Sequence, residues 1–226
     1  MPNINLTTLA WVPNVNQASM TQPEDSNQCG AFALVAAVGA FGAFTANTVV
    51  SYQNAGPGPV NNQETITTEL DFTGLSQRVY NVTGILNHDL PAPDPELING
   101  GDYNSPAAMA KVIADLGRPQ PRVNVQQDGY QLLNALYPGE TARCQQVVGA
   151  GNVNTDAGQY GAPANGETHI VCVNVNDGGL HCLARGSDGH FYDPADGTLN
   201  NNWNPVNTGD AMGAHYTFSG LWIVIT

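Results

Sequence analysis

Three side chains of this sequence have types and settings that suit nucleophilic catalysis: Cys29, His181 and Asp193. Cys29 follows the polar, turn-prone segment 22–28 and opens a run of small apolar residues, and this change predicts a buried helix that begins at the cysteine. The free N–H groups and the positive end of the macrodipole at a helix start favour a thiolate. The alternative is an unreactive core cysteine, since free cysteines are among the most buried residues.

The second stretch that could do chemistry is 179–194, whose pattern predicts a β-hairpin with its turn at 187–189. His181 opens the first strand and Asp193 ends the second, so the two side chains are expected to be neighbours. A carboxylate beside an imidazole fixes its tautomer and stabilises the imidazolium. If Cys29 docks against this pair, the chain has a nucleophile, a base and an orienting residue. Asp196, in the turn that follows Asp193, is an alternative orienting residue.

The order and local sequence of these segments, Gln22 to Gly30 and His181 to Asp193, resemble the papain-like cysteine peptidase superfamily. The compact branches are the most similar: C39-like peptidases, YopT/AvrPphB-type effectors and phytochelatin synthase. The resemblance implies an α+β, papain-like fold, in which an N-terminal central helix that carries the cysteine packs on a C-terminal antiparallel β-sheet. It also implies that a glutamine before the cysteine donates to the oxyanion. Gln22 is the matching candidate, and Gln28 is a weaker one.

The function that this resemblance implies is hydrolysis of a peptide or amide carbonyl by a cysteine nucleophile. Cys29 would attack the carbonyl carbon, His181 would accept and return the proton, and the Cys29 N–H with Gln22 would hold the oxyanion. A thiol protease, a deamidase and an acyl transferase share this intermediate. The resemblance further suggests a bacterial effector or toxin with a protein or peptide substrate. Trp203 is a candidate shield of the His181–Asp193 pair, with core packing as the alternative.

Two other functions are compatible with parts of the sequence. In the first, the chain is a non-catalytic binding or structural module on the same fold, with Cys29 buried. In the second, a metal-dependent hydrolase binds zinc through the histidines of the predicted sheet, together with Asp193 or Asp196. The histidines in question are His169, His181 and His190. They lack the short spacing of known zinc sites, so the thiol mechanism is favoured and no cofactor or metal is expected.

The composition limits the partners. The net charge is −13 and Lys111 is the single lysine, which argues against nucleic acid or an anionic membrane surface as a partner. The longest apolar stretch, 31–43, is too short to span a bilayer, and the N-terminus has no Sec-type signal pattern. We therefore expect cytoplasmic synthesis, compatible with delivery as an effector. No linker interrupts the chain, so residues 1–226 are expected to form one domain.

Local patterns also predict the elements around the site. Helices are expected over 29–46, 105–117 and 130–137, and strands over 169–175, 180–185, 190–192 and 221–225. Segment 69–87 is a helix or a strand, 53–59 is a loop, 90–96 is an extended connector and 1–20 wraps the surface or forms an edge strand. Segment 149–166 has almost no large apolar residue and predicts a functional or mobile loop. Cys172 and Cys182 are expected in the core on adjacent strands, and His88 and His215 in solvated loops.

Overall fold

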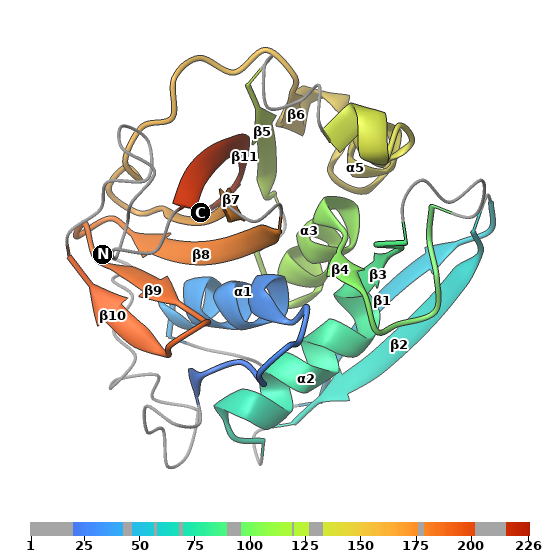
Figure 1. Ribbon diagram of the computed structural model, residues 1–226, viewed down its shortest axis with the longest axis horizontal. Helices are drawn as coiled ribbons and strands as arrows, with labels where there is room; N and C mark the ends of the chain where they lie inside the picture. The colour runs from blue at the N-terminus through green and yellow to red at the C-terminus, as the bar shows by residue number, and fades with distance from the viewer. Residues whose placement is uncertain are drawn as a thin grey trace.

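Helix α1 (Cys29–Gly39) forms from the small apolar residues that follow the polar segment 22–28, and all of its residues are buried. A helix that is apolar on every side must be covered on every side. Figure 1 shows the large sheet along one side of α1 and the helices α2 (Phe72–Thr83) and α3 (Pro106–Asp115) near the other. The helix predicted over 29–46 is confirmed at its first residue, Cys29, but it ends earlier than predicted, at Gly39.

The computed structural model describes residues 20–42, 47–56, 58–67, 70–89, 96–118, 120–126, 133–175, 179–201 and 216–226. Our expectations for segment 1–19, for Trp203 and for His215 lie outside these residues. So does most of the predicted connector over 90–96. Of the predicted helix over 130–137, residues 133–137 are described; 133–136 are helical and 137 is not.

The large sheet gives the chain a mixed α+β architecture. Its strand order is β10-β9-β8-β7-β11-β5-β6, and all neighbours are antiparallel except β5 and β6. The strands are β5 (Arg122–Val125), β6 (Val153–Asn154), β7 (Thr168–Val175), β8 (Leu180–Gly186), β9 (Phe191–Asp193), β10 (Thr198–Asn200) and β11 (Tyr216–Ile225). The four strands predicted from the sequence are confirmed as β7, β8, β9 and β11, although β11 begins earlier than expected.

The two faces of β7 and β8 have different neighbours, because successive side chains of a strand point to opposite faces. Ile170, Cys172, Cys182 and Ala184 belong to the same apolar core as α1. Val173 and Leu183 pack on the opposite face with Phe191 and Tyr216. The sheet therefore separates a main core, which holds α1, from smaller apolar clusters.

The helical side of the protein contains two small antiparallel pairs. Strand β1 (Thr48–Asn54) pairs with β2 (Val60–Ile66), and β3 (Gly84–Leu86) pairs with β4 (Tyr103–Asn104). The loop predicted over 53–59 begins later, because Gln53 and Asn54 belong to β1. The strands on either side of the loop were not predicted, because their polar residues alternate with few large apolar ones. Segment 69–87, predicted as a helix or a strand, contains both: α2 and then β3.

The predicted helix over 105–117 is confirmed as α3. Ser105 accepts a hydrogen bond from the Ala108 N–H at 3.1 Å, Pro106 is the first helical residue, and Gly117 has φ +89 just after the end. Helix α5 (Glu140–Val148) lies next to α3 and was not predicted. Its buried Glu140 accepts from Ser105 Oγ and from the Ala107 N–H, so it joins the two helices.

The prediction of a long unstructured loop over 149–166 is wrong in part. The segment contains a 3-10 turn, η3 (Ala150–Asn152), and β6, which pairs parallel with β5. Further along, Tyr160 is buried against Trp222 and Phe218 of β11. The Tyr160 ring, the β5–β6 pairing and the hydrogen bonds that link Ala157 to Val125 and Gly158 to Gln126 therefore hold a segment whose composition gave no periodic signal.

Candidate active site

His181 and Asp193 form a buried pair at the end of the large sheet. His181 Nε2 donates to Asp193 Oδ1 at 2.8 Å, and the two side chains are 7% and 3% exposed. The predicted hairpin brings these two residues together. Strands β8 and β9 pair through Ala184 and Tyr192, and the Gly186 N–H donates to His190 O where the turn closes. His190 was expected in the second strand, but it lies just before it.

The Asp193 carboxylate is held by two further donors. Oδ1 also accepts from the Ala195 N–H at 2.9 Å, and Oδ2 accepts from the Tyr216 hydroxyl at 3.1 Å. Burial raises the pKa of Asp193, but the hydrogen bond and charge of His181, with these two donors, lower it below its usual value. Asp193 is therefore an anion at neutral pH.

Cys29 is the first residue of α1, where the helix leaves N–H groups without intrahelical partners. The preceding residue, Gln28, makes no side-chain cap. Both His181 and Cys182 lie close enough to the Cys29 side chain to shift the pKa of its thiol. His181 and Cys182 point to opposite faces of β8, so the start of α1 meets β8 at a place where it contacts both. Strand β9 leaves that part of β8 open, because it pairs only with Ala184 and Arg185.

Charge couples Cys29 to His181. Burial alone would lower the pKa of His181, but hydrogen bonds with Asp193 and Cys29, and the charges of both, raise it to about 10. For Cys29, the neighbouring Cys182 and burial raise the pKa of the thiol well above its usual value, although the interaction with His181 lowers it in part. The charge of His181 is therefore the contribution that favours the Cys29 thiolate, against burial and Cys182. Nε2 is engaged by Asp193, which leaves Nδ1 as the ring nitrogen available to Cys29.

The segment before Cys29 is fastened to the turn that carries Asp193. The Gln22 N–H donates to Pro194 O at 2.8 Å, and the Tyr192 hydroxyl donates to Met20 O. Gln22 Nε2 lies 3.4 Å from Ser26 O, and Gln22 Oε1 is buried without a hydrogen-bond partner. The Gln22 amide thus stays within its own loop here, and its oxyanion role stays a prediction.

Gln28 points elsewhere. Its Nε2 donates to Gln77 Oε1 of α2 at 3.0 Å, so the side chain joins α1 to α2. This contact makes Gln28 a weaker donor candidate than Gln22, in agreement with the ranking from the sequence.

Asn104 braces the start of α1 from the helical side. Its Nδ2 donates to Asn27 O at 2.7 Å, while its Oδ1 accepts from Thr83 Oγ1 at 2.7 Å. A Cβ on Gly30 would lie 2.7 Å from both Cβ and Cγ of Asn104, so only glycine fits at that position. Sequence reasoning missed Asn104, because nothing local to β4 indicates a contact with the residues before Cys29.

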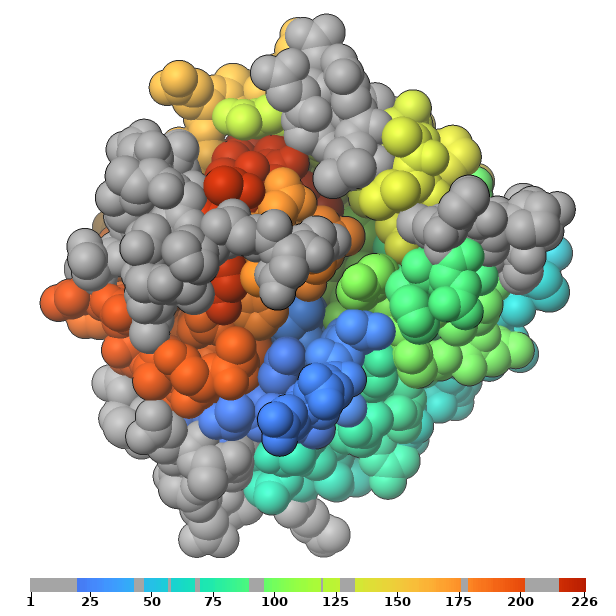
Figure 2. Space-filling model, viewed as in Figure 1, coloured from blue at the N-terminus to red at the C-terminus, as the bar shows by residue number. Residues whose placement is uncertain are grey.

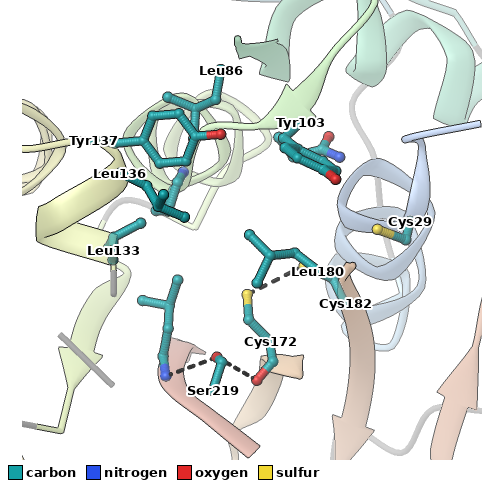
Figure 3. A pocket seen from close by; sticks show the side chains of 13 residues that line it. Cys29, Leu86, Tyr103, Leu133, Leu136, Tyr137, Cys172, Leu180, Cys182 and Ser219 are labelled. Carbon is teal, nitrogen blue, oxygen red and sulfur yellow. Dashed lines mark hydrogen bonds between the residues drawn. The ribbon is translucent and has the colours of Figure 1, made fainter. Parts of the chain in front are cut away.

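A pocket with a cavity volume of about 60 Å³ opens beside Cys29. Figure 3 shows Cys29 on α1 at one side, Tyr103 and Tyr137 at another, and Cys172 and Cys182 on the strands below. Most of the remaining wall is aliphatic: Leu86, Pro106, Leu133, Leu136, Leu180 and Leu221. In Figure 2, the blue segment that leads into α1 reaches the surface between the orange strands and the green helical part. The pocket thus combines three thiols, Cys29 among them, with walls that are otherwise mainly apolar.

The structure separates the two aspartates that the sequence offered as the orienting residue. Asp196 is exposed, and its Oδ1 accepts from the N–H and hydroxyl of Thr198, so Asp193 is the carboxylate that the structure brings to His181. Tyr216 stacks at a tilt on His181, with ring centroids 5.4 Å apart. Tyr216 therefore covers the His181–Asp193 pair, and sequence reasoning missed it, while the prediction for Trp203 stays outside the described residues.

The zinc alternative finds no support in the described part of the chain, where no group of three or more His, Cys, Asp or Glu side chains could hold a metal ion. His169 instead contacts Tyr160, with Nδ1 3.1 Å from the hydroxyl. Burial lowers the pKa of His169 to about 4, so it is neutral at neutral pH.

His88 was expected to be solvated and alone, and this is wrong in part. The ring is 49% exposed, but Nδ1 lies 2.7 Å from Oδ1 of the buried Asp102. The same carboxylate accepts from the backbone N–H groups of His88 and Tyr103. The sequence around His88 did not indicate this contact, because Asp102 lies further along the chain, beyond the predicted connector.

Comparison with known proteins adds one match. The family model described as "Invasion plasmid antigen J, cysteine protease" matches residues 21–226. No curated protein and no solved structure matched the chain. Within the described residues, no helix is both long enough and apolar enough to cross a membrane.

Proposed function

Since the chain belongs to the Invasion plasmid antigen J family of cysteine proteases, we propose that Cys29 is its nucleophile, His181 its general acid and base, and Asp193 the residue that orients His181. One observation carries this assignment. Cys29, at the start of a buried helix, lies close enough to His181 for the imidazole to lower the pKa of its thiol, and Nε2 of that imidazole is held by a buried carboxylate. This arrangement supports a papain-like mechanism and fold.

The reaction proceeds in two halves. The Cys29 thiolate attacks the carbonyl carbon of a peptide bond, and the negative oxygen is stabilised by the Cys29 N–H at the helix start. The proton on His181 Nδ1 passes to the departing amine as the C–N bond breaks, which leaves a thioester. A water then gives a proton to His181 and attacks the thioester, and the carboxylate product and Cys29 are released. Gln22 supplies a second oxyanion donor if its amide turns toward the sulfur.

Asp193 and Tyr216 act on His181 rather than on the substrate. Asp193 keeps the Nε2 proton in place and stabilises the charged ring that forms during the reaction. Burial and the charge of Asp193 raise the pKa of Tyr216, so its hydroxyl stays protonated and donates to the carboxylate.

The pocket points to the chemistry of the substrate. Its aliphatic and aromatic walls begin at Cys29, so an apolar group of the substrate next to the scissile bond would fill it. The substrate is therefore a protein or peptide with such a group, and the family supports a role as a bacterial effector that acts on it. A deamidase or an acyl transferase would use the same thioester and differ in what attacks it.

Substitution of the nucleophile tests the proposal. Cys29→Ala should abolish peptide cleavage while circular dichroism and the melting temperature change little, since the lost thiol leaves a cavity worth about 1 kcal/mol. Cys144→Ser is the matched control, because Cys144 is a buried cysteine on α5 outside the pocket. Cleavage that persists in a folded Cys29→Ala protein would contradict the proposal.

A further inference from the structure

Three cysteines meet at the candidate active site. Cys29, Cys172 and Cys182 all line the pocket, and each is a free thiol (Figure 3). Cys182 Sγ lies 3.2 Å from Cys172 Sγ, and Cys182 shares the pocket wall with Cys29, close enough to shift the pKa of the Cys29 thiol. Cys182 is therefore the middle member of a row of three thiols. A role in core packing alone would require neither the contact with Cys29 nor a place in the pocket wall.

The pairing of β7 with β8 places two of these thiols in a geometry that suits a disulfide. Cys172 lies directly opposite Cys182 in the antiparallel register. The Val175 N–H donates to Gly179 O at 2.8 Å, and hydrogen-bonded pairs alternate with non-bonded pairs along such a ladder. Three steps from Val175, Cys172 is at a non-bonded position, where Cα atoms are about 4.5 Å apart. That separation is within the range of about 4.4–6.8 Å found for disulfides.

We propose that this row is an oxidative modification site. In it, Cys182 forms a disulfide with an oxidised Cys29, and Cys172 then displaces Cys29 from that disulfide. The inference rests on the reactivity proposed for Cys29, and its oxidant is a hydroperoxide small enough to enter the pocket. A sulfenic acid with no resolving thiol beside it is oxidised further to a sulfinic acid, which simple thiols do not reduce. A thiol in contact with Cys29 diverts the sulfenic acid into a disulfide.

The steps balance with one hydrogen peroxide. The Cys29 thiolate attacks a peroxide oxygen, so an S–O bond forms, the O–O bond breaks, and the departing hydroxide takes up a proton as water. Cys182 sulfur then attacks the Cys29 sulfur, so an S–S bond forms and the oxygen leaves as a second water with the thiol proton. Cys172 finally attacks Cys182 Sγ, and Cys29 leaves as the thiol. Cys172 and Cys182 lose two electrons, the peroxide gains them, and Cys29 is unchanged.

Peroxide titration of the reduced full-length chain tests this sequence. After each dose, free thiols are alkylated with iodoacetamide, and the digested protein is mapped by mass spectrometry. In the wild type we expect a Cys172–Cys182 disulfide while Cys29 remains open to alkylation. In Cys172→Ser, a Cys29–Cys182 disulfide should accumulate, and dithiothreitol should restore the Cys29 thiol. In Cys182→Ser, Cys29 should pass to the sulfinic acid, which dithiothreitol does not reverse.

The controls separate this inference from the proposed function. Cys144→Ser should behave as the wild type, since Cys144 does not line the pocket. If iodoacetamide labels Cys29 in the reduced wild type but peroxide forms no disulfide with Cys182, the inference alone is overturned. If Cys29 reacts with neither reagent, the proposed function is contradicted as well. Because the deciding measurement is made on the wild type, misfolding of a variant leaves the test intact.

Discussion

The protein places a histidine beside a buried aspartate twice, and the surroundings of the two pairs differ. His181 Nε2 lies 2.8 Å from Asp193 Oδ1, and His88 Nδ1 lies 2.7 Å from Asp102 Oδ1. Only the His181 ring is buried, since its side chain is 7% exposed and that of His88 is 49% exposed, and Cys29 lies close enough to His181 to raise the pKa of the ring. A short distance between imidazole and carboxylate is therefore shared, while burial of the ring and a thiol beside it distinguish the proposed catalytic pair.

The two carboxylates also serve different neighbours. Asp102 accepts from the backbone N–H groups of His88 and Tyr103 at 3.0 and 2.8 Å, so it links the backbone just after β3 to the start of β4. Asp193 accepts from two side chains, His181 and Tyr216, besides one backbone N–H. We infer that Asp102 acts on the backbone fold, and that Asp193 acts on the charge of a ring.

The largest expected difference is in the catalytic activity of variants at the two histidines. His181→Ala should lower kcat/KM by about 10²–10⁴-fold, the usual contribution of a general acid and base, and His88→Ala should change it by no more than about twofold. Both variants are assayed on any cleaved peptide, with folding checked by circular dichroism. Equal losses in two folded variants would remove the distinction between the pairs.

Substitution of the two aspartates should affect different quantities: kcat for Asp193 and the free energy of unfolding for Asp102. Asp193→Asn should reduce kcat strongly but less than His181→Ala does, because the amide still holds the ring while its stabilising charge is gone. Asp102→Asn should leave kcat nearly unchanged and lower the free energy of unfolding by about 1–3 kcal/mol, since a buried acceptor of several N–H groups is altered. Turnover assays and urea unfolding measure the two effects. A stronger effect of Asp196→Asn than of Asp193→Asn on kcat would instead assign the orienting role to Asp196.

The pH dependence of stability should reveal the raised pKa of His181. Its pKa is about 10 in the folded protein and about 6.5 unfolded, so the folded state binds the proton more tightly. The resulting stability is fully present below about pH 6.5 and is lost as the pH rises toward 10. Urea unfolding from pH 6 to 10 should show a decline in the wild type that is smaller in His181→Gln. Parallel curves for the two proteins would contradict the charged state assigned to His181.

A smaller effect is expected at the helix start. Gly30→Ala places a Cβ 2.7 Å from Asn104 Cβ, so we expect overpacking to lower stability by about 1–3 kcal/mol and to displace Cys29. Asn104→Ala should relieve the clash, so the double variant should recover part of the melting temperature. Additive losses would show that Asn104 does not brace this segment.

The smallest effect should come from the ring that covers the buried pair. Tyr216→Phe removes the hydroxyl that donates to Asp193 Oδ2 at 3.1 Å but keeps the ring on His181. We expect a loss of about 0.5–1.5 kcal/mol in the free energy of unfolding and a small shift in the pH profile of kcat. A loss of activity as large as that of Asp193→Asn would mean that Tyr216 has a direct role in the reaction.

The parts of the site that could be predicted depend on local sequence. The change from polar to apolar residues fixes the start of α1 at Cys29, and a short turn brings His181 near Asp193. Both signals lie within a few residues of the side chains they position. The papain-like assignment and the roles of these residues stay predictions, supported by the family match and the geometry.

The remaining parts depend on contacts between distant segments. Tyr216 reaches Asp193 because β11 pairs with β7, and Asn104 reaches Asn27 across a sequence separation of 77 residues. The β1–β2 hairpin, with its alternating polar residues, gains its place by packing on α2 and α3. None of these contacts has a local pattern, so propensity and periodicity could not indicate them.

The most direct test of the account is the rate of Cys29 alkylation by iodoacetamide as a function of pH, followed by mass spectrometry in wild type and His181→Ala. An imidazolium that stabilises the Cys29 thiolate predicts that Cys29 is labelled at a lower pH than Cys144, and that its labelling shifts to higher pH when His181 is removed. Labelling of Cys29 that is no faster than that of Cys144, with the same pH profile in both proteins, would contradict the assignment of Cys29 and His181 as the catalytic pair.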